Sequence, residues 1–226
     1  MSESNLDQKA IEVHEILLDF YGEPTWRDPL PPISELVSTI LSQNTNDTNR
    51  DAAFHSLRRA FPTWEAVRDA EQGAVIEAIR TAGLANQKGP RIQKVLKQIT
   101  AERGSLDLDF LADLPLEEAR EWLLRFKGVG PKTAAIVLQF SLNIPAFPVD
   151  THIYRVTKRL GLVPEKMSVE KAHEHLENLF QSEWFYGDHL NIIRLGREIC
   201  SPRKPKCEQC PLNGICTYYL EQKTGG

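Results

Sequence analysis

Four cysteines near the end of the chain are the residues whose type and spacing most clearly predict chemistry. They are the only cysteines present, and they run Cys200-x6-Cys207-x2-Cys210-x5-Cys216. Thiolates are soft ligands that suit zinc or iron–sulfur clusters. Structural zinc usually uses two short Cys pairs, whereas only Cys207 and Cys210 form such a pair here. The spacing therefore predicts a four-thiolate metal site and favours one cubane cluster over a zinc knuckle.

A glycine-rich turn, Gly128-Val129-Gly130-Pro131-Lys132, separates two predicted helices. Glycine permits a tight turn and a close approach of the backbone to a ligand, and proline is favoured at the first helical position. The exposed N–H groups and the positive end of the helix dipole form a phosphate site. The pattern indicates a helix-hairpin-helix in which Gly128 and Gly130 clamp a DNA backbone; an ordinary tight turn is the alternative.

Lys132 stands in the first turn of the second of these helices. An ammonium group is mildly disfavoured at the positive end of a helix dipole, and such violations of local preference often mark functional sites. An amine nucleophile must be neutral to react, and this position favours the neutral form. Lys132 is therefore a candidate nucleophile, and a lysine that contacts phosphate is the alternative.

Asp150 comes directly before a predicted helix that starts at Thr151. An aspartate in this position is expected to cap the helix through the backbone N–H groups. A carboxylate held there can also stabilise positive charge that develops on a nearby sugar, or move a proton to or from a lysine. Asp150 is thus a candidate catalytic residue with capping as its minimal role.

Charge and hydropathy limit the partners of the chain. The net charge is −4, but residues 1–24 carry −5 and the remainder carries +1. A locally basic face can bind phosphate whatever the total charge, so nucleic acid is not excluded. No apolar run approaches the roughly 20 residues that span a bilayer, and the acidic N-terminus does not resemble a signal peptide. We expect a cytoplasmic protein with no membrane partner.

The hydrophobic spacing is helical nearly everywhere, and about ten helices joined by short loops predict an all-α protein. The extended run 144–148 is the best candidate for a crossing between two helical lobes. The expected helix boundaries are Gly22, Asp47 or Thr48 as an N-cap, Pro62, Thr63, Gly83, Gly104 and Pro115, followed by helices at 131–142, 151–160, 168–180 and 184–200.

The hairpin, Lys132, Asp150 and the four-cysteine loop occur in an order and at spacings that resemble the endonuclease III family of DNA glycosylases. The resemblance covers about residues 33–216. It implies two helical lobes, one at 25–145 with the helix-hairpin-helix motif and one formed by 1–24 plus 146–226. It also implies that the four cysteines bind a [4Fe–4S] cluster in a C-terminal loop.

The same resemblance implies a reaction. Lys132 would attack the sugar C1′ of a nucleotide with an oxidised pyrimidine, with assistance from Asp150. A Schiff base would form, and β-elimination would cut the strand 3′ to the abasic site. The partner would be double-stranded DNA with damaged bases or abasic sites. We expect a monomer that associates with the nucleoid if the source is a prokaryote.

Further positions are assigned to DNA binding by the resemblance. Ile40-Leu-Ser-Gln43-Asn44-Thr-Asn-Asp47 is similar to the family segment Leu-Leu-Ser-Ala-Gln-Ala-Thr-Asp, and a gapless match puts Asn44 where the family glutamine fills the space left by a flipped base. Either Gln43 or Asn44 could contact the orphaned partner base. A polar helix terminus is the alternative.

The segment Gly83-Leu84-Ala85-Asn86-Gln87-Lys88 resembles a wedge loop in which Leu84 enters the base stack, unless Leu84 is simply a buried leucine at a helix end. Ala85 replaces an aromatic residue of some relatives, and Lys127 belongs to a Phe-Lys pair that replaces the usual Leu-Pro. His152 is expected to order the site through hydrogen bonds. The remaining expected DNA contacts are Lys88, Lys127, Arg203, Lys204 and Lys206.

Two other functions remain open from the sequence. A monofunctional mismatch glycosylase would share the fold, but related mismatch enzymes typically carry Ser or Tyr where this chain has Lys132. A non-catalytic DNA-binding module with structural zinc would need only the hairpin and the cysteines. Visible absorption separates a cluster from zinc, and trapping on abasic DNA separates a lyase from a binding module.

Overall fold

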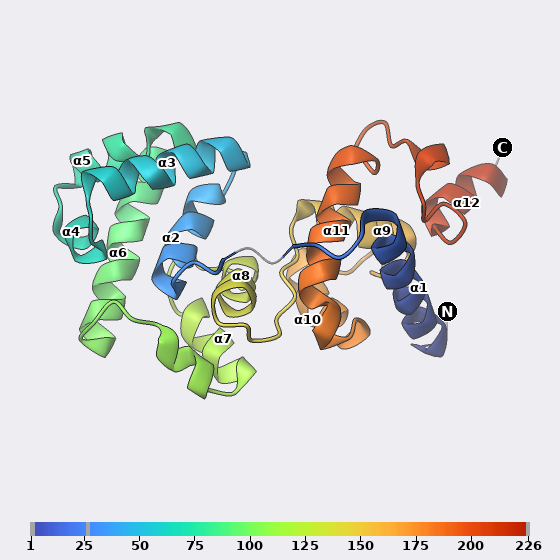
Figure 1. The fold of residues 1–226 in the computed structure, drawn as a ribbon, viewed down its shortest axis with the longest axis horizontal. Coiled ribbons are helices and arrows are strands. Elements are labelled where there is room, and N and C mark those ends of the chain that lie inside the picture. The colour runs from blue at the N-terminus through green and yellow to red at the C-terminus, as the bar shows by residue number, and fades with distance from the viewer. Residues whose placement is uncertain (1–2, 26–27, 225–226) are drawn as a thin grey trace. The chain divides into compact units, whose positions relative to one another are not determined.

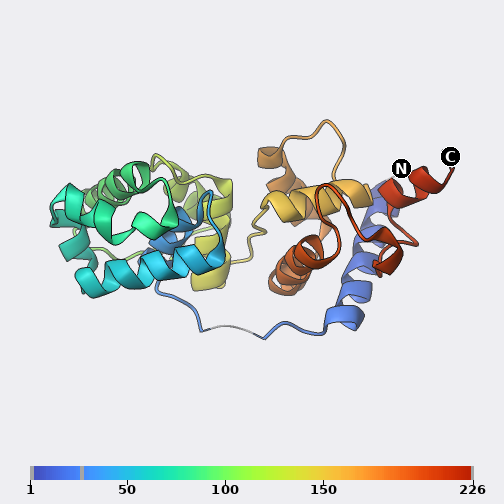
Figure 2. The same cartoon turned by 90° about the horizontal axis from the view of Figure 1, so that it is seen from above.

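The protein is described by a computed structural model that covers residues 3–25 and 28–224. The chain forms two compact units (Figures 1 and 2). Unit 2 is the continuous stretch Pro29–Ile144, and unit 1 combines Met1–Asp28 with Pro145–Gly226. Every regular element in the described part of the chain is helical, which confirms the all-α prediction.

Unit 2 is built around a buried helix. Each residue of α2 (Pro32–Ser42) from Pro32 to Leu41 is buried, and α2 packs against α3, α6 and α8. Pro32 at the first position of α2 starts the helix without losing a hydrogen bond. The elements of unit 2 after α2 are α3 (Asp47–Ala60), α4 (Trp64–Asp69), α5 (Gln72–Ala78), η1 (Arg80–Ala82), α6 (Ala85–Arg103), η2 (Asp109–Asp113), α7 (Leu116–Leu124) and α8 (Pro131–Ser141).

Unit 1 joins the two ends of the chain. In α1 (Glu3–Tyr21), Ala10, Val13 and Leu17 form one apolar stripe at helical spacing, and this stripe is buried in the core that also contains Phe147. Helix α1 packs against α11 and α10 (Figure 1). The other elements of unit 1 are α9 (Thr151–Leu160), α10 (Val169–Leu179), η3 (Ser182–Trp184), α11 (Phe185–Glu198), η4 (Cys207–Gln209) and α12 (Thr217–Thr224).

Several predicted helix boundaries are confirmed, and one N-cap prediction is wrong. Thr63 caps α4 by accepting from the Ala66 N–H at 3.1 Å, and Gly104 ends α6 in the left-handed conformation. The cap of α3 is Asn46, not Asp47 or Thr48. Asn46 is extended and its side chain accepts from the backbone N–H three residues later at 2.8 Å, so the helix starts one or two residues earlier than expected.

Two further differences between the predicted and the observed helices concern the end of α5 and the presence of α12. Gly83 ends the short turn η1, because α5 already stops at Ala78. The polar helix α12 was not predicted at all, because none of its residues is buried and it has no apolar stripe. No helix within residues 3–25 and 28–224 has the length and apolar character needed to cross a membrane.

Candidate active site and metal centre

The four predicted metal ligands line a single pocket in unit 1. Cys200 follows the end of α11, Cys207 is the first residue of η4, Cys210 comes directly after η4, and Cys216 comes directly before α12. The turn after α11 is fixed by the Cys200 N–H, which donates to the Leu195 carbonyl at 2.8 Å. The loop thus directs thiols from four positions into one pocket, as a cluster with four thiolate ligands requires.

The electrostatics of the pocket suit a cationic metal centre. Burial is the main reason that the pKa of Cys210 rises to about 11, and burial also raises the pKa of Cys207 and of Cys216. Thiolates in such a place need a strong positive partner, and metal coordination deprotonates a thiol outright. Arg159 supplies part of the positive charge through a contact of 3.3 Å between its Nη1 and Cys200 Sγ. The donor set therefore fits a [4Fe–4S] cluster.

Arg159 also organises the loop around the pocket. Its guanidinium donates to the carbonyls of Ser201 and Pro202, at 2.8 Å each. Its Cζ lies 4.7 Å from the centroid of the Tyr218 ring. One arginine from α9 therefore connects the first ligand, the residues after it and the helix that follows the last ligand. Sequence reasoning missed Arg159, since it lies 41 residues before Cys200 and belongs to no local motif.

The hairpin in unit 2 has the geometry expected of a phosphate clamp. Helix α7 ends at Leu124, Gly128 adopts a φ of 97°, and α8 begins at Pro131. Gly130 is the N-cap of α8, no side chain caps this helix, and a Cβ on Gly130 would meet no atom within 4 Å. The start of α8 is therefore uncapped by any side chain and has free space beside Gly130, where an anion can approach.

Lys132 occupies the first turn of α8, with no acidic residue in that turn. Its side chain is half-buried. Among residues 3–25 and 28–224, Lys132 Nζ makes no hydrogen bond or ion pair. No partner in this part of the chain holds the amine in place, so it can approach a ligand at the hairpin, and the geometry is consistent with a nucleophile. Lys127 is exposed in the loop that precedes α8.

Asp150 in unit 1 is confirmed as the N-cap of α9. Its Oδ1 accepts from the backbone N–H groups of His152 and Ile153, at 2.8 Å each. The second carboxylate oxygen is not used by the cap. His152 Nδ1 lies 3.2 Å from Arg155 Nη2, and the same guanidinium group donates to the Gly196 carbonyl at 2.9 Å. His152 therefore belongs to a hydrogen-bonded network that orders the start of α9. Lys132 and Asp150 belong to different units.

Gln43 and Asn44 have different roles in unit 2. Gln43 is half-buried: its Nε2 donates to the Gly128 carbonyl at 3.1 Å, and its Oε1 accepts from Arg91 Nη1 at 2.7 Å. Asn44 is exposed and has a φ of 53°. Of the two amides, Gln43 is engaged by the hairpin, and Asn44 is available to a base.

Leu84 has the exposure expected of a wedge residue. It is 47% exposed and has a φ of 50°, which is uncommon for a side chain with a Cβ. A leucine with a left-handed backbone conformation and an exposed side chain lowers the free energy of unfolding, whereas a leucine packed in the core raises it. Such backbone outliers tend to occur at functional sites. The alternative of a buried leucine at a helix end is wrong.

Lys88 lies in a different environment from the one expected for a phosphate contact. Its side chain is 1% exposed. Its Nζ donates to the carbonyls of Leu41 and Ala82, at 2.8 Å each. Burial, followed by the positive charge of Arg91, lowers the pKa of Lys88. A cation enclosed in this way cannot reach a phosphate, so the sequence-based assignment of Lys88 to a DNA contact is corrected.

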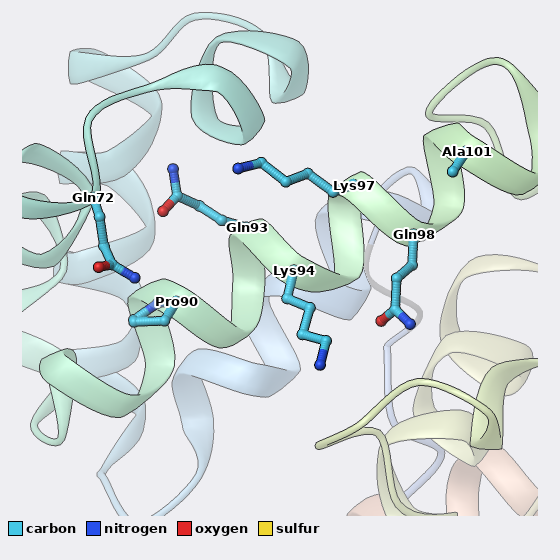
Figure 3. A pocket seen from close by; sticks show the side chains of 7 residues that line it. All are labelled: Gln72, Pro90, Gln93, Lys94, Lys97, Gln98 and Ala101. Carbon is cyan, nitrogen blue, oxygen red and sulfur yellow. The ribbon is translucent and has the colours of Figure 1, made fainter.

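The remaining predicted DNA contacts are on the surface. Arg203, Lys204 and Lys206 are exposed in the loop between Cys200 and Cys207, where they are free to approach a phosphate backbone. A separate surface pocket in unit 2 lies along α6 and is lined by residues such as Gln93, Lys94 and Lys97 (Figure 3). It contains none of the predicted site residues.

The fold and the hairpin define a class of protein, and the comparisons with known proteins agree. Residues 37–182, more than half of the chain, match the HhH-GPD superfamily of base excision DNA repair proteins. Residues 200–216 match the iron–sulfur binding domain of endonuclease III. The protein is thus a helix-hairpin-helix enzyme of base excision repair.

Individual relatives show which family within this class the chain belongs to. Endonuclease III of Sulfolobus acidocaldarius is 35% identical over 82% of this chain and 82% of its own length. A protein of Arabidopsis thaliana named as a DNA glycosylase is 40% identical over 80% of this chain, which spans 64% of that protein. The chain belongs to the endonuclease III family, is a DNA glycosylase/AP lyase by class, and carries the [4Fe–4S] cluster of that family.

Solved structures show the same fold. A non-covalent endonuclease III–DNA complex aligns with a TM-score of 0.80 at 24% identity, over 99% of each chain. A thermostable thymine-DNA glycosylase aligns with a TM-score of 0.81 at 22% identity, over 97% of this chain and 100% of that one. At these identities the likeness establishes the fold, which enzymes of different specificity share.

Proposed function

We propose that this protein removes oxidised pyrimidines from double-stranded DNA and then cuts the strand, with Lys132 as the nucleophile. The observation that carries the proposal is the position of Lys132. It is an amine without an ion-pair partner in the described part of the chain, and it lies in the first turn of the helix that follows the hairpin, which no side chain caps. A phosphate held by the N–H groups of that helix would place a deoxyribose within reach of the amine, which supplies the orientation that catalysis needs.

The proposed reaction has two stages. The Lys132 amine forms a bond to C1′ while the C1′–N bond to the base breaks, and the base leaves with the electron pair and takes up a proton. Opening of the sugar ring then gives a Schiff base between Nζ and C1′. Loss of a proton from C2′ and departure of the 3′ phosphate oxygen complete β-elimination, and water hydrolyses the imine to release Lys132.

Asp150 is proposed to assist from unit 1. One of its oxygens accepts two backbone N–H bonds, at 2.8 Å each, which fixes the carboxylate while its other oxygen remains available. We infer that this oxygen stabilises the positive charge that develops on the sugar and moves the proton to or from Lys132.

The proposed DNA contacts follow from exposure. Asn44 and Leu84 would enter the duplex at the flipped nucleotide, since an inserted side chain offsets part of the cost of unstacking. Gly128, Gly130 and Lys127 would hold one stretch of backbone. The cluster would play a structural part by holding a loop whose basic residues, Arg203, Lys204 and Lys206, contact another stretch.

Borohydride trapping on duplex DNA with one abasic site tests the proposal. Wild-type protein and the Lys127→Gln variant should form a covalent complex, because both retain the amine of Lys132. Lys132→Gln should form none while keeping its cluster absorption and its helical content. Lys127 is exposed in the loop before α8, and loss of its proposed phosphate contact should weaken binding to DNA without preventing the covalent complex.

A panel of duplexes, each with one oxidised pyrimidine or one mismatch, tests the substrate class. Release of an oxidised pyrimidine with strand cleavage is expected. Trapping that survives Lys132→Gln would refute the assignment of the nucleophile. Excision of a mismatched base without strand cleavage would replace the proposal by a monofunctional mismatch glycosylase. Sedimentation of the active species is expected to show a monomer.

A further inference from the structure

Lys88 is a fully buried cation that the proposed reaction does not use. Burying an ammonium group is costly unless it is hydrogen-bonded. Here Nζ donates to the carbonyls of Leu41 and Ala82, at 2.8 Å each, and the side chain is 1% exposed. A neutral residue would fill the same space at lower cost. The presence of a lysine here therefore points to a function of its two hydrogen bonds to backbone carbonyls.

The first carbonyl lies at the end of α2, where backbone acceptors need partners. The last four carbonyls of α2 are all satisfied: Thr39 by the Ser42 hydroxyl, Ile40 by the Gln43 N–H, Leu41 by Lys88 and Ser42 by the Thr45 N–H. A cation is favourable at this negative end of the helix dipole. Lys88 therefore acts as a cap for α2, supplied from another helix.

The second carbonyl belongs to Ala82, at the end of η1 and two residues before Leu84. Leu41 is three residues before Asn44. One ammonium group thus joins the backbones that lead to Asn44 and to Leu84. These are two of three non-glycine residues with a positive φ in the described part of the chain, at 53° and 50°. Both are exposed, so little of their own packing holds them in this strained conformation.

A second set of hydrogen bonds joins the loop that contains Asn44 to the hairpin. Gln43 donates to the Gly128 carbonyl at 3.1 Å and accepts from Arg91 at 2.7 Å. Arg91 lies one turn after Lys88 on α6, so one helix braces the Asn44 loop, the Leu84 turn and the hairpin. Three segments that are distant in sequence are thereby connected by hydrogen bonds within unit 2.

We propose that Lys88 is a positioning residue that sets the separation of Asn44 and Leu84, so that both can enter a duplex together. The proposal rests on the proposed function, because it takes these two residues as the ones that enter the DNA. It assigns to Lys88 no contact with substrate. Loss of the ammonium group should impair opening of the duplex and leave the chemistry of Lys132 intact.

Lys88→Met tests this inference, with Lys94→Met as the matched control. Both lysines belong to α6, but Lys94 is exposed and extends from the outer face of the helix (Figure 3). A fluorescent base analogue beside the lesion reports unstacking. We expect its signal to fall at least fivefold in Lys88→Met, and single-turnover excision from duplex DNA to slow at least tenfold. Trapping on a single-stranded abasic oligonucleotide should stay within twofold of wild type.

The salt dependence of duplex binding separates positioning from a phosphate contact. Loss of a phosphate-contacting lysine lowers the slope of log K against log salt by about 1. We expect an unchanged slope for Lys88→Met. Lys88→Arg, which keeps two donors and the charge, should restore most of the unstacking signal. Lys88→Gln, which can reach only one carbonyl, should give an intermediate signal and provides a second test if the methionine variant does not fold.

Two results would overturn the inference: a slope reduced by about 1, or unstacking in Lys88→Met and Lys88→Gln equal to that of wild type. Failure of the proposed function is distinguishable from both. If wild-type protein does not trap on the single-stranded abasic oligonucleotide, the role of Lys132 fails whatever Lys88 does. If wild-type protein traps and the Lys88 variants unstack normally, only the positioning role fails.

Discussion

Replacement by alanine should have different effects at the two glycines of the hairpin. A Cβ on Gly128 would lie 2.2 Å from Arg91 Cδ and 2.5 Å from Arg91 Nε, and the φ of this residue is 97°. Gly130 has a φ of −101°, and its Cβ would meet no atom within 4 Å. Gly128→Ala should therefore destabilise unit 2, whereas Gly130→Ala should weaken DNA binding without unfolding the protein.

The magnitudes follow from the geometry. Backbone strain at Gly128→Ala costs about 1–3 kcal/mol, and displacing Arg91 breaks its bond to Gln43, which contributes about 1 kcal/mol. A total of about 2–4 kcal/mol corresponds to a fall in melting temperature of roughly 5–15 °C for a chain of this size. Gly130→Ala should remain within about 1 kcal/mol of wild type, because the loss of a glycine N-cap opposes the gain from a less flexible unfolded chain.

Thermal unfolding and duplex affinity are the two measurements. Gly130→Ala should lose about tenfold in affinity for undamaged duplex, equivalent to one charge-assisted hydrogen bond of about 1.5 kcal/mol. Equal melting temperatures for the two variants would refute the argument that Arg91 lies across Gly128. Wild-type affinity in a folded Gly130→Ala protein would show that the open space at the start of α8 is not where the backbone binds.

Two further substitutions separate structure from chemistry in unit 1. Asp150→Asn keeps a side-chain acceptor for the cap of α9, so the free energy of unfolding should stay within about 0.5 kcal/mol of wild type. Single-turnover excision should slow about 100-fold, because the carboxylate is lost. A rate near that of wild type would show that Asp150 has no part in the reaction. Arg159→Gln loses the contact with Cys200 Sγ and the bonds to two loop carbonyls, at about 1.5–3 kcal/mol for each bond from a charged donor. Its visible absorption should decay several times faster under a chelator than that of Arg203→Gln, an exposed control in the same loop; matching decay rates would contradict the role given to Arg159.

Local features of the site could be predicted from the sequence because their physics is local. The turn at Gly128 and Gly130, the cap at Asp150 and the short spacing of the cysteines each depend on a few neighbouring residues. The helices with a clear apolar stripe were predicted for the same reason. Polar α12, which has no such stripe, was missed.

The bracing of the site could not be predicted, because it depends on contacts between distant residues. Lys88 and Leu41 are 47 residues apart, and Arg91 and Gln43 are 48 apart. Lys88 lies in phase with the apolar stripe of α6 at Ile92 and Val95, and Lys94 does not. That pattern alone does not show whether the ammonium group is buried, because a lysine on an apolar face can extend its charge to solvent. Only the folded unit shows that Lys88 is buried and hydrogen-bonded to two carbonyls, whereas Lys94 is exposed to solvent.

The division of unit 1 into two separate stretches of chain affects how the protein is made. Unit 2 is continuous and can fold as soon as its last helix leaves the ribosome, since domains generally fold as units during synthesis. The apolar stripe of α1, which includes Ala10, Val13 and Leu17, has its partners only after residue 145. Helix α1 must therefore wait for the segment after residue 145 before it can pack, and the four-cysteine site is complete only once Cys216 has emerged.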